Sequence, residues 1–160
     1  LHFYLKNFHQ WQSGILYFVY SMINGVTLSV VFVVYELSSI VSVFIISALV
    51  FGILGFIGYK TNRDLNSWGT YIIVFLIAGI VLSLLNLIVF RSSVLDIAID
   101  WLILILFCGA TIYDINKIKV LQESADINQD KIHIYCAMQL YLDFINIFLR
   151  ILSLFGKSKD

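Results

Sequence analysis

Five long apolar stretches constrain this chain more than any other feature of its sequence. Each is nearly free of charge and has the length of about 20 residues that a helix needs to cross a membrane. The predicted spans are Gly14–Tyr35, Ser39–Tyr59, Thr70–Phe90, Leu95–Ile115 and Ile132–Phe155. Because the apolar runs are continuous and do not alternate with polar residues, they favour helices over a β-barrel. We therefore expect an all-α, polytopic transmembrane helix bundle in which residues 1–160 form a single transmembrane domain.

The composition excludes several classes of protein. Hydrophobic residues make up 61% of the chain and charged residues 12%, so too few polar side chains remain to cover a water-soluble globule. Disorder is excluded because the chain is 16% aromatic. Ten basic and ten acidic residues cancel, which leaves no electrostatic footprint for nucleic acid. The predicted partner of the surface is the lipid bilayer. The two cysteines, Cys108 and Cys136, fall in apolar stretches and are interpreted as packing residues.

The connections between the spans carry an uneven distribution of Lys and Arg. With five spans, the N-terminal segment, the connection around residues 60–69 and the longest connection, Asn116–Lys131, share one side. That side carries Lys6, Lys60, Arg63, Lys117, Lys119 and Lys131, and the opposite side carries Arg91, Lys157 and Lys159. Since positive loops remain in the cytoplasm, the first side is predicted to be cytoplasmic and the C-terminus to lie outside.

The last apolar stretch differs from the others because polar residues run along one of its faces. These residues follow one another at spacings of three and four, which places them on one side of a helix. They are Cys136, Gln139, Asp143, Asn146, Arg150 and Ser153. Lipid offers polar groups no hydrogen-bond partner, so this face must contact protein or water. We therefore expect the last helix to lie inside the bundle, with Gln139, Asn146 and Arg150 supporting Asp143.

The preceding span offers a partner for this polar face. Asp100, Phe107, Thr111 and Asp114 share one side of the helix, and antiparallel packing could bring Asp114 to Asp143. An ionisable residue within a span is costly and indicates a functional site. Two carboxyl groups at one site titrate as a unit, and when both are ionised they offer oxygen ligands to Ca²⁺. The spacing thus predicts a proton sensor with a possible Ca²⁺ site at Asp114 and Asp143.

The same charged residues could instead have purely structural roles. Asp114 could form an interfacial charge pair with Lys117, and Asp143 could form a bridge to Arg150 through Asn146. Asp96 and Asp100 are interpreted as solvated residues near the outer surface, where the helix N-terminus stabilises their negative charge. The sequence contains no phosphate-binding glycine loop, zinc-ligand spacing or nucleophile paired with histidine, so nothing indicates an enzyme or a bound cofactor.

Four segments carry a resemblance to a known family. They are Asn-Gly-Val-Thr-Leu-Ser at 24–29, Gly-Tyr-Lys-Thr-Asn-Arg-Asp-Leu at 58–65, Phe-Cys-Gly-Ala-Thr-Ile-Tyr-Asp at 107–114 and Leu-Tyr-Leu-Asp-Phe-Ile-Asn-Ile-Phe-Leu at 140–149. With them the chain resembles the Bax inhibitor-1 family in its bacterial branch. The resemblance implies a bacterial inner (plasma) membrane protein of seven spans with the last helix central. The five spans here then correspond to the third to seventh, and two N-terminal spans are expected to be absent.

The resemblance also implies a function. Family members are pH-sensitive Ca²⁺ leak channels, and Asp114 and Asp143 match the paired aspartates of their sensor, with Ca²⁺ as the transported ion. In that picture a proton shared between the two carboxyl groups holds the pore closed, and its loss biases a helix movement. An alternative is a non-transporting membrane stress regulator, such as a modulator of a membrane-bound protease. A further possibility is that the five-span form has no function alone. The oligomeric state is left open.

Overall fold

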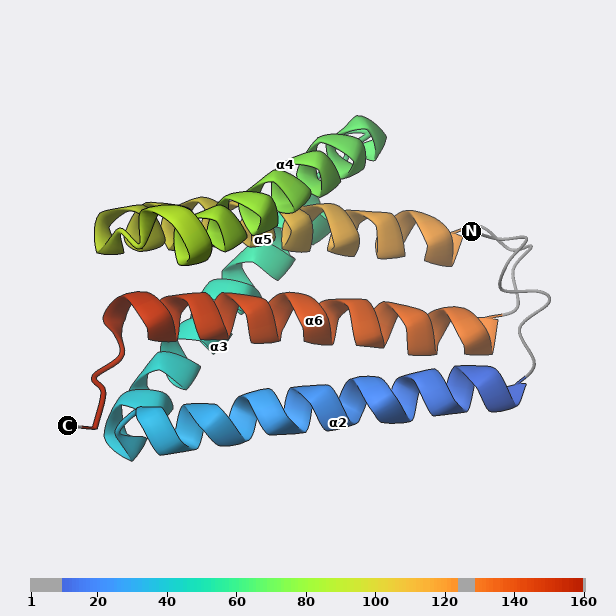
Figure 1. Cartoon of the computed structure of the whole chain (residues 1–160). Helices are drawn as coiled ribbons and strands as arrows, with labels where there is room; N and C mark the ends of the chain where they lie inside the picture. Colours follow the sequence, from blue (N-terminus) through green and yellow to red (C-terminus); the bar gives the residue numbers. More distant parts are fainter. Residues whose placement is uncertain (1–9, 124–128, 160) are drawn as a thin grey trace. The chain divides into compact units, whose positions relative to one another are not determined.

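The described part of the chain is built from helices (Figure 1). The structure is a computed structural model that describes residues 10–123 and 129–159. The helices are α2 (Gln10–Val34), α3 (Leu37–Lys60), α4 (Asn66–Leu85), a π-helical turn η1 (Asn86–Phe90), α5 (Ser93–Glu123) and α6 (Gln129–Phe155). Within these ranges the only β-type pairing is an isolated antiparallel bridge between Tyr35 and Ser158. The prediction of an all-α membrane protein is confirmed.

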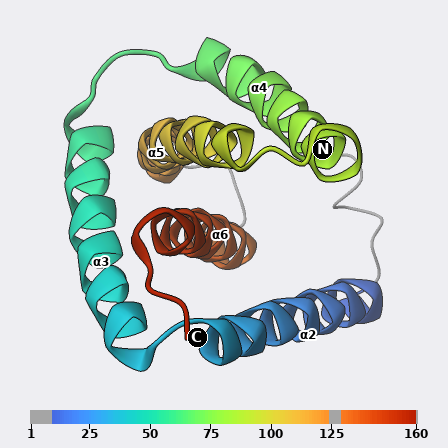
Figure 2. The same ribbon diagram turned by 60° about the vertical axis from the view of Figure 1, so that its left-hand side comes forward.

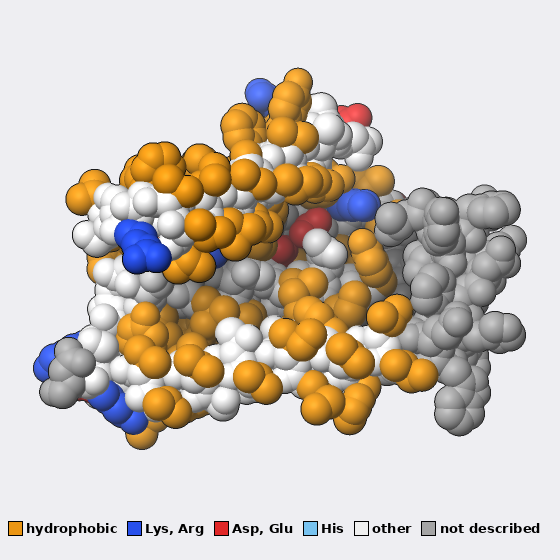
Figure 3. All heavy atoms as spheres, viewed as in Figure 1, with side chains coloured by type: hydrophobic (Ala, Val, Ile, Leu, Met, Phe, Trp, Pro, Cys, Tyr) orange, Lys and Arg blue, Asp and Glu red, His pale blue; other side chains and the backbone are white. Residues whose placement is uncertain are grey.

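The helices have the length and surface of membrane spans. Among the described residues, four helical stretches are long and apolar enough to cross a bilayer: Leu37–Lys60, Asn66–Phe90, Ser93–Glu123 and Tyr135–Phe155. A shorter apolar stretch, Phe18–Val34, belongs to α2. Hydrophobic side chains cover most of the described surface in Figure 3, and acidic side chains are visible in a recess among them. The chain is a multi-pass membrane protein whose apolar exterior is solvated by lipid.

Helix α5 continues well past the apolar span predicted for it. Residues 116–123 are helical, and α6 begins at Gln129, so much of the predicted connection Asn116–Lys131 is helix. The segment contains Lys, Leu, Gln and Glu, which favour helix, and neither Gly nor Pro. Polarity ends a membrane span without ending the helix, which is why the apolar boundary falls short of the helix boundary.

One buried side chain organises the turn from α4 to α5. Asn86 is 1% exposed, and its amide donates to the carbonyl of Ser92 (2.9 Å) and to Asp96 Oδ1 (2.6 Å). Its Oδ1 accepts the Ser92 N–H at 3.1 Å. Arg91 takes a left-handed conformation (φ 48°), which ends the helix, and its N–H donates to the Asn86 carbonyl. The Asn86 side chain therefore links the end of η1 to the start of α5.

The chain divides into two compact units. The first comprises Leu1–Leu37 and Lys157–Asp160. In it the C-terminal tail pairs with the end of α2: the Glu36 N–H donates to the Lys157 carbonyl (3.0 Å), and the Lys159 N–H donates to the Val34 carbonyl (2.8 Å). Lys157 Nζ also lies 3.6 Å from Glu36 Oε1. The tail and the turn after α2 are thus held together by backbone hydrogen bonds.

The second unit comprises Ser38–Gly156 and contains α3 to α6. Helices α5 and α6 lie side by side, with α3 and α4 alongside them (Figure 2). Helix α4 contacts α5 where Gly79 meets Ile103. Helix α3 contacts α6 through Phe44 and Phe51, whose rings stand in T-shaped arrangements with Phe144, with ring centres 5.5 and 5.6 Å apart.

Close helix approach in this unit depends on glycine. Gly58 of α3 faces α5 so closely that a Cβ there would lie 2.8 Å from the Ile112 carbonyl oxygen. Small residues permit this kind of contact between helices in lipid. Helix α6 supplies some of the most deeply buried side chains of the unit, Ile147 and Leu152. The closely packed α5–α6 pair can therefore hold the side chains of a site in fixed positions.

Candidate functional site

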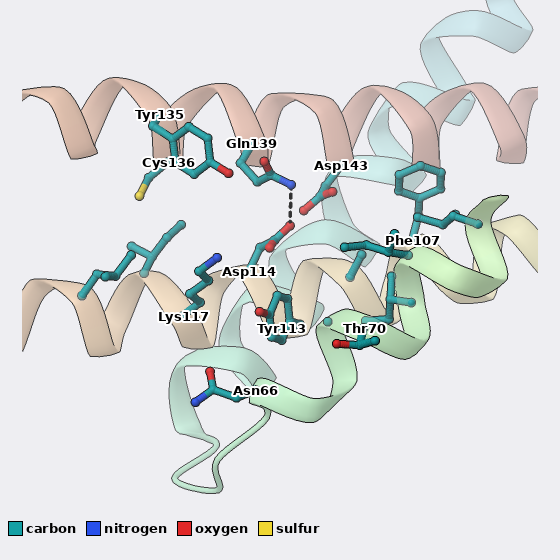
Figure 4. Close-up of a pocket in the computed structure, with 17 residues that line it drawn as sticks. Asn66, Thr70, Phe107, Tyr113, Asp114, Lys117, Tyr135, Cys136, Gln139 and Asp143 are labelled. Atoms are coloured by element: carbon teal, nitrogen blue, oxygen red, sulfur yellow. Dashed lines mark hydrogen bonds between the residues drawn. The ribbon is translucent and has the colours of Figure 1, made fainter. Parts of the chain in front are cut away.

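Asp114 and Asp143 lie together between α5 and α6. They are 8% and 2% exposed, and their carboxyl groups are within hydrogen-bonding reach of each other (Figure 4). Gln139, one turn before Asp143 on α6, donates its Nε2 hydrogen to Asp114 Oδ2 at 3.2 Å. Antiparallel packing of two polar helix faces produces this arrangement. The structure thus brings together the two residues that the spacing paired, and their role in sensing protons or binding Ca²⁺ stays a prediction.

The hydrogen bonding of Asp143 is incomplete. Its Oδ2 atom is buried and receives a hydrogen bond from no donor in the described part of the chain. Leaving such an atom unsatisfied costs about 1–3 kcal/mol. A hydrogen bond between two carboxyl groups requires a proton on one of them, because an ionised carboxylate only accepts. A hydrogen bond between Asp114 and Asp143 would therefore need one proton held between them.

The aspartate pair lies on the wall of a hollow of about 330 Å³, which we call the aspartate hollow. Helices α4, α5 and α6 line it, with the labelled polar and aromatic side chains of Figure 4 around its wall. A second hollow of about 520 Å³, the loop-side hollow, lies between residues 61–66 and the last turns of α5. Four residues line both hollows: Asn66, Tyr113, Lys117 and Leu121. The two hollows therefore adjoin at these side chains.

Tyr113 is held tightly where the hollows meet. A Cβ at Gly69 of α4 would lie 2.7 Å from the Tyr113 hydroxyl oxygen, so the absence of a side chain at Gly69 makes room for the ring. The Lys117 ammonium lies 5.8 Å from the centre of the same ring. On the far wall of the loop-side hollow, Lys119 Nζ donates to the Tyr59 carbonyl (3.1 Å) and to Asn62 Oδ1 (3.0 Å). These bonds fix α5 to the end of α3 and to the connection that follows it.

Arg150 belongs to a different polar cluster from the aspartate pair. Its guanidinium donates to Asp100 Oδ1 and forms an ion pair with it, and Ser153 donates to Asp100 Oδ2. The Asp100 and Arg150 side chains are 14% and 31% exposed. The expectation that Asp100 is simply solvated is therefore wrong, because antiparallel packing places Arg150 beside it.

Two further structural interpretations can be compared with the structure, and one of them is wrong. The bridge from Asp143 to Arg150 through Asn146 is wrong, since Asn146 donates to the Leu142 carbonyl of its own helix at 2.8 Å. Its amide thus bonds to the backbone of its own helix, and Arg150 pairs with Asp100 instead. Among the described side chains, Lys117 does not come within ion-pair distance of Asp114, which accepts a hydrogen bond from Gln139, although the charge of Lys117 does act on Asp114. The polar face of α6 thus separates into an aspartate site, an ion pair and a local hydrogen bond.

A cation at the aspartate pair would find only part of a coordination shell. Across the described residues, no group of three or more His, Cys, Asp or Glu side chains converges on one point. Ca²⁺ takes six to eight oxygen ligands, so the shell that the two carboxylates begin would have to be completed by water. Such a partial set suits a weakly held cation better than a permanently bound one.

Comparison with known proteins identifies the family. The profile of the family described as "Inhibitor of apoptosis-promoting Bax1" matches residues 1–160. The chain belongs to the Bax inhibitor-1 family. It is 39% identical over 151 residues to the inner membrane protein YbhL of Escherichia coli, covering 92% of this chain and 64% of YbhL. It is also 39% identical over 149 residues to an uncharacterized protein of Borreliella burgdorferi, covering 91% and 63%. This Bax inhibitor-1 chain thus spans less than two thirds of the length of these relatives.

Two features of this Bax inhibitor-1 chain escaped the sequence reasoning. The pairing of Asp100 with Arg150 needed the register of α5 against α6, although both residues were already on the faces predicted to meet. The contact of Gly69 with Tyr113 had a weaker signal: a glycine just before a span, and an aromatic residue four positions before a lysine. Neither spacing alone specifies a partner on another helix.

Proposed function

We propose that this Bax inhibitor-1 family protein is a pH-sensitive Ca²⁺ leak of the bacterial inner membrane, with Asp114 and Asp143 as its sensor. One observation carries the proposal: two buried carboxyl groups from different helices share a site on the wall of a hollow, and one of their oxygens has no donor. The inner-membrane location is supported by the E. coli relative, which is named an inner membrane protein.

The chemistry follows from the number of protons that the pair holds. With one proton between them, the carboxyl groups attract each other and hold α5 against α6. When both are ionised they repel, which favours separation of the helices and creates a site of double negative charge for Ca²⁺. The pair is thus a switch in which a local change of charge biases a movement of two helices.

The incomplete coordination shell at the aspartate pair suits a site that conducts Ca²⁺ better than one that stores it. A conducting site must attract the ion strongly enough to admit it and weakly enough to release it. Two carboxylates on the wall of a hollow, with water completing the shell, meet both needs. The loop-side hollow would admit the ion from the side that carries the positive connections, which we propose to be the cytoplasm.

The proposal is tested by Ca²⁺ flux into liposomes that contain the purified protein, measured over a pH series from about 5 to about 8. We expect wild-type flux to depend on pH, and Asp114→Asn and Asp143→Asn to abolish that dependence, because an amide cannot exchange the proton. Glu36→Gln is the control, since it removes a half-exposed acid that lines neither hollow. Unchanged flux and pH dependence in both Asn variants would overturn the proposal and favour a non-transporting regulator, such as a modulator of a membrane-bound protease.

A further inference from the structure

Lys117 occupies the place where the two hollows meet. It lies three residues after Asp114 on α5, which puts it one turn nearer the loop-side hollow on nearly the same face of the helix. Its side chain points from α5 into the space beside Asp114 (Figure 4). An ion that entered from the loop-side hollow would therefore pass the ammonium before it reached the carboxyl groups.

Few contacts hold the Lys117 ammonium in place. It forms no ion pair with any carboxylate of the described residues, and its close contact is the Tyr113 ring, 5.8 Å from the ring centre. It nevertheless interacts electrostatically with Asp114. A lysine carries a compact charge on a flexible four-carbon stem, so the ammonium can move between the ring and the carboxyl groups without a change in the backbone.

The other lysines near this end of the chain do not share these properties. Lys119 is fixed by the Tyr59 carbonyl and by Asn62, and it lines only the loop-side hollow. Lys60 lies over the Phe56 ring at 5.7 Å, much as Lys117 lies over Tyr113, but it lines neither hollow. Lys60 therefore offers a matched comparison: the same charge and the same kind of ring contact, away from the aspartates.

We propose that Lys117 is a tethered counter-ion that competes with a divalent cation for the Asp114–Asp143 pair. With its ammonium toward the carboxylates, it neutralises part of their charge and obstructs the passage between the hollows. With its ammonium over Tyr113, it leaves the pair open to an incoming ion. The inference rests on the proposed function and adds to it a residue that sets the affinity and admission of the ion.

The test compares Lys117→Met, Lys117→Arg and Lys60→Met in the purified protein. Methionine keeps the length of the side chain and removes the charge, whereas arginine keeps the charge. Equilibrium binding of radioactive Ca²⁺ and Ca²⁺ flux into liposomes are measured for each, with and without Asp143→Asn. We expect Lys117→Met to bind Ca²⁺ at least about tenfold more tightly than wild type, because a positive charge beside the ion is lost. Lys117→Arg and Lys60→Met should stay within about twofold of wild type.

The outcomes separate the two proposals. If Lys117→Met tightens binding only where Asp143 is intact, the counter-ion role is supported. If Lys117→Met matches Lys60→Met while the Asp variants still lose their pH dependence, the counter-ion role is overturned and the leak proposal stands. If the Asp variants change neither binding nor flux, both are overturned. Thermal unfolding of each variant in detergent identifies any loss of folding, and Lys117→Arg then reports on the charge alone.

Discussion

At the scale of single residues, the site depends on what each side chain lacks as much as on what it contributes. Asp143 Oδ2 lacks a hydrogen-bond donor among the described residues, and this favours a proton shared with Asp114. Gly69 lacks a side chain, and this admits the Tyr113 ring between the hollows. In both cases the missing group determines what its neighbour can do.

Gly69→Ala should displace Tyr113. The new Cβ would lie 2.7 Å from the hydroxyl oxygen and 2.8 Å from the ring carbon that bears it, and a rigid ring cannot bend away. We expect a loss of about 1–3 kcal/mol in stability, as for other overpacked sites. Thermal or denaturant unfolding in detergent measures it.

Gly52→Ala is the matched control for this substitution. It adds the same methyl group to a helix at a position with no atom within 4 Å of the new Cβ. Since alanine favours helix over glycine by up to about 1 kcal/mol, Gly52→Ala should be neutral or stabilising. An equal loss of stability in both variants would contradict the packing argument at Gly69.

At the scale of elements, α5 and α6 are joined by two polar contacts some distance apart along their length. The Asp100–Arg150 ion pair lies toward the start of α5 and the end of α6, and the aspartate pair lies nearer the opposite end. Apolar and small side chains, such as Ile103, Ala110 and Ile147, are buried in this part of the bundle. The Asp100–Arg150 contact carries opposite charges and is attractive, whereas under the proposed function the aspartate pair becomes repulsive when both carboxyl groups are ionised, so movement should concentrate at the aspartate end.

The ion pair should contribute measurably to stability. Arg150→Met leaves Asp100 largely buried, with Ser153 as its remaining partner among the described residues. We expect a loss of about 1–3 kcal/mol, reduced from the fully buried case because Arg150 is partly exposed. A double-mutant cycle with Asp100→Asn measures the coupling. If the double variant loses the sum of the two single losses, the pair contributes no coupling energy.

The helices were predictable, and their contacts only in part. Apolar length identified the spans, because lipid imposes the same requirement on every spanning helix. The spacing on α6 and the face on α5 paired Asp114 with Asp143, since both faces needed a polar neighbour. The same reasoning gave Arg150 to Asp143 as one option, because register between two helices depends on packing that a single helix does not encode. The extension of α5 to Glu123 was also missed, since hydropathy reports the membrane and not the helix.

At the scale of the whole molecule, the positively charged connections predict the orientation of the chain in the membrane. If the connection at residues 61–65 faces the cytoplasm, the C-terminal tail faces outside, since α4, α5 and α6 lie between them. Arg63→Cys should then be labelled by a membrane-impermeant maleimide only after the inner membrane is opened. Lys157→Cys should be labelled in intact spheroplasts. The reverse pattern would show the opposite orientation and place the loop-side hollow outside.

The backbone pairing of Glu36 with Lys157 has a consequence for how the chain threads the bilayer. Two residues joined by a hydrogen bond must lie on the same face of the membrane, so the chain between them must cross an even number of times. The four helical stretches long enough to span in the described part of the chain all fall in that interval, and four satisfies the condition where three or five would not. If one of these helices failed to insert, the chain between Glu36 and Lys157 would cross the membrane an odd number of times. The two residues would then lie on opposite faces, and their hydrogen bond could not form.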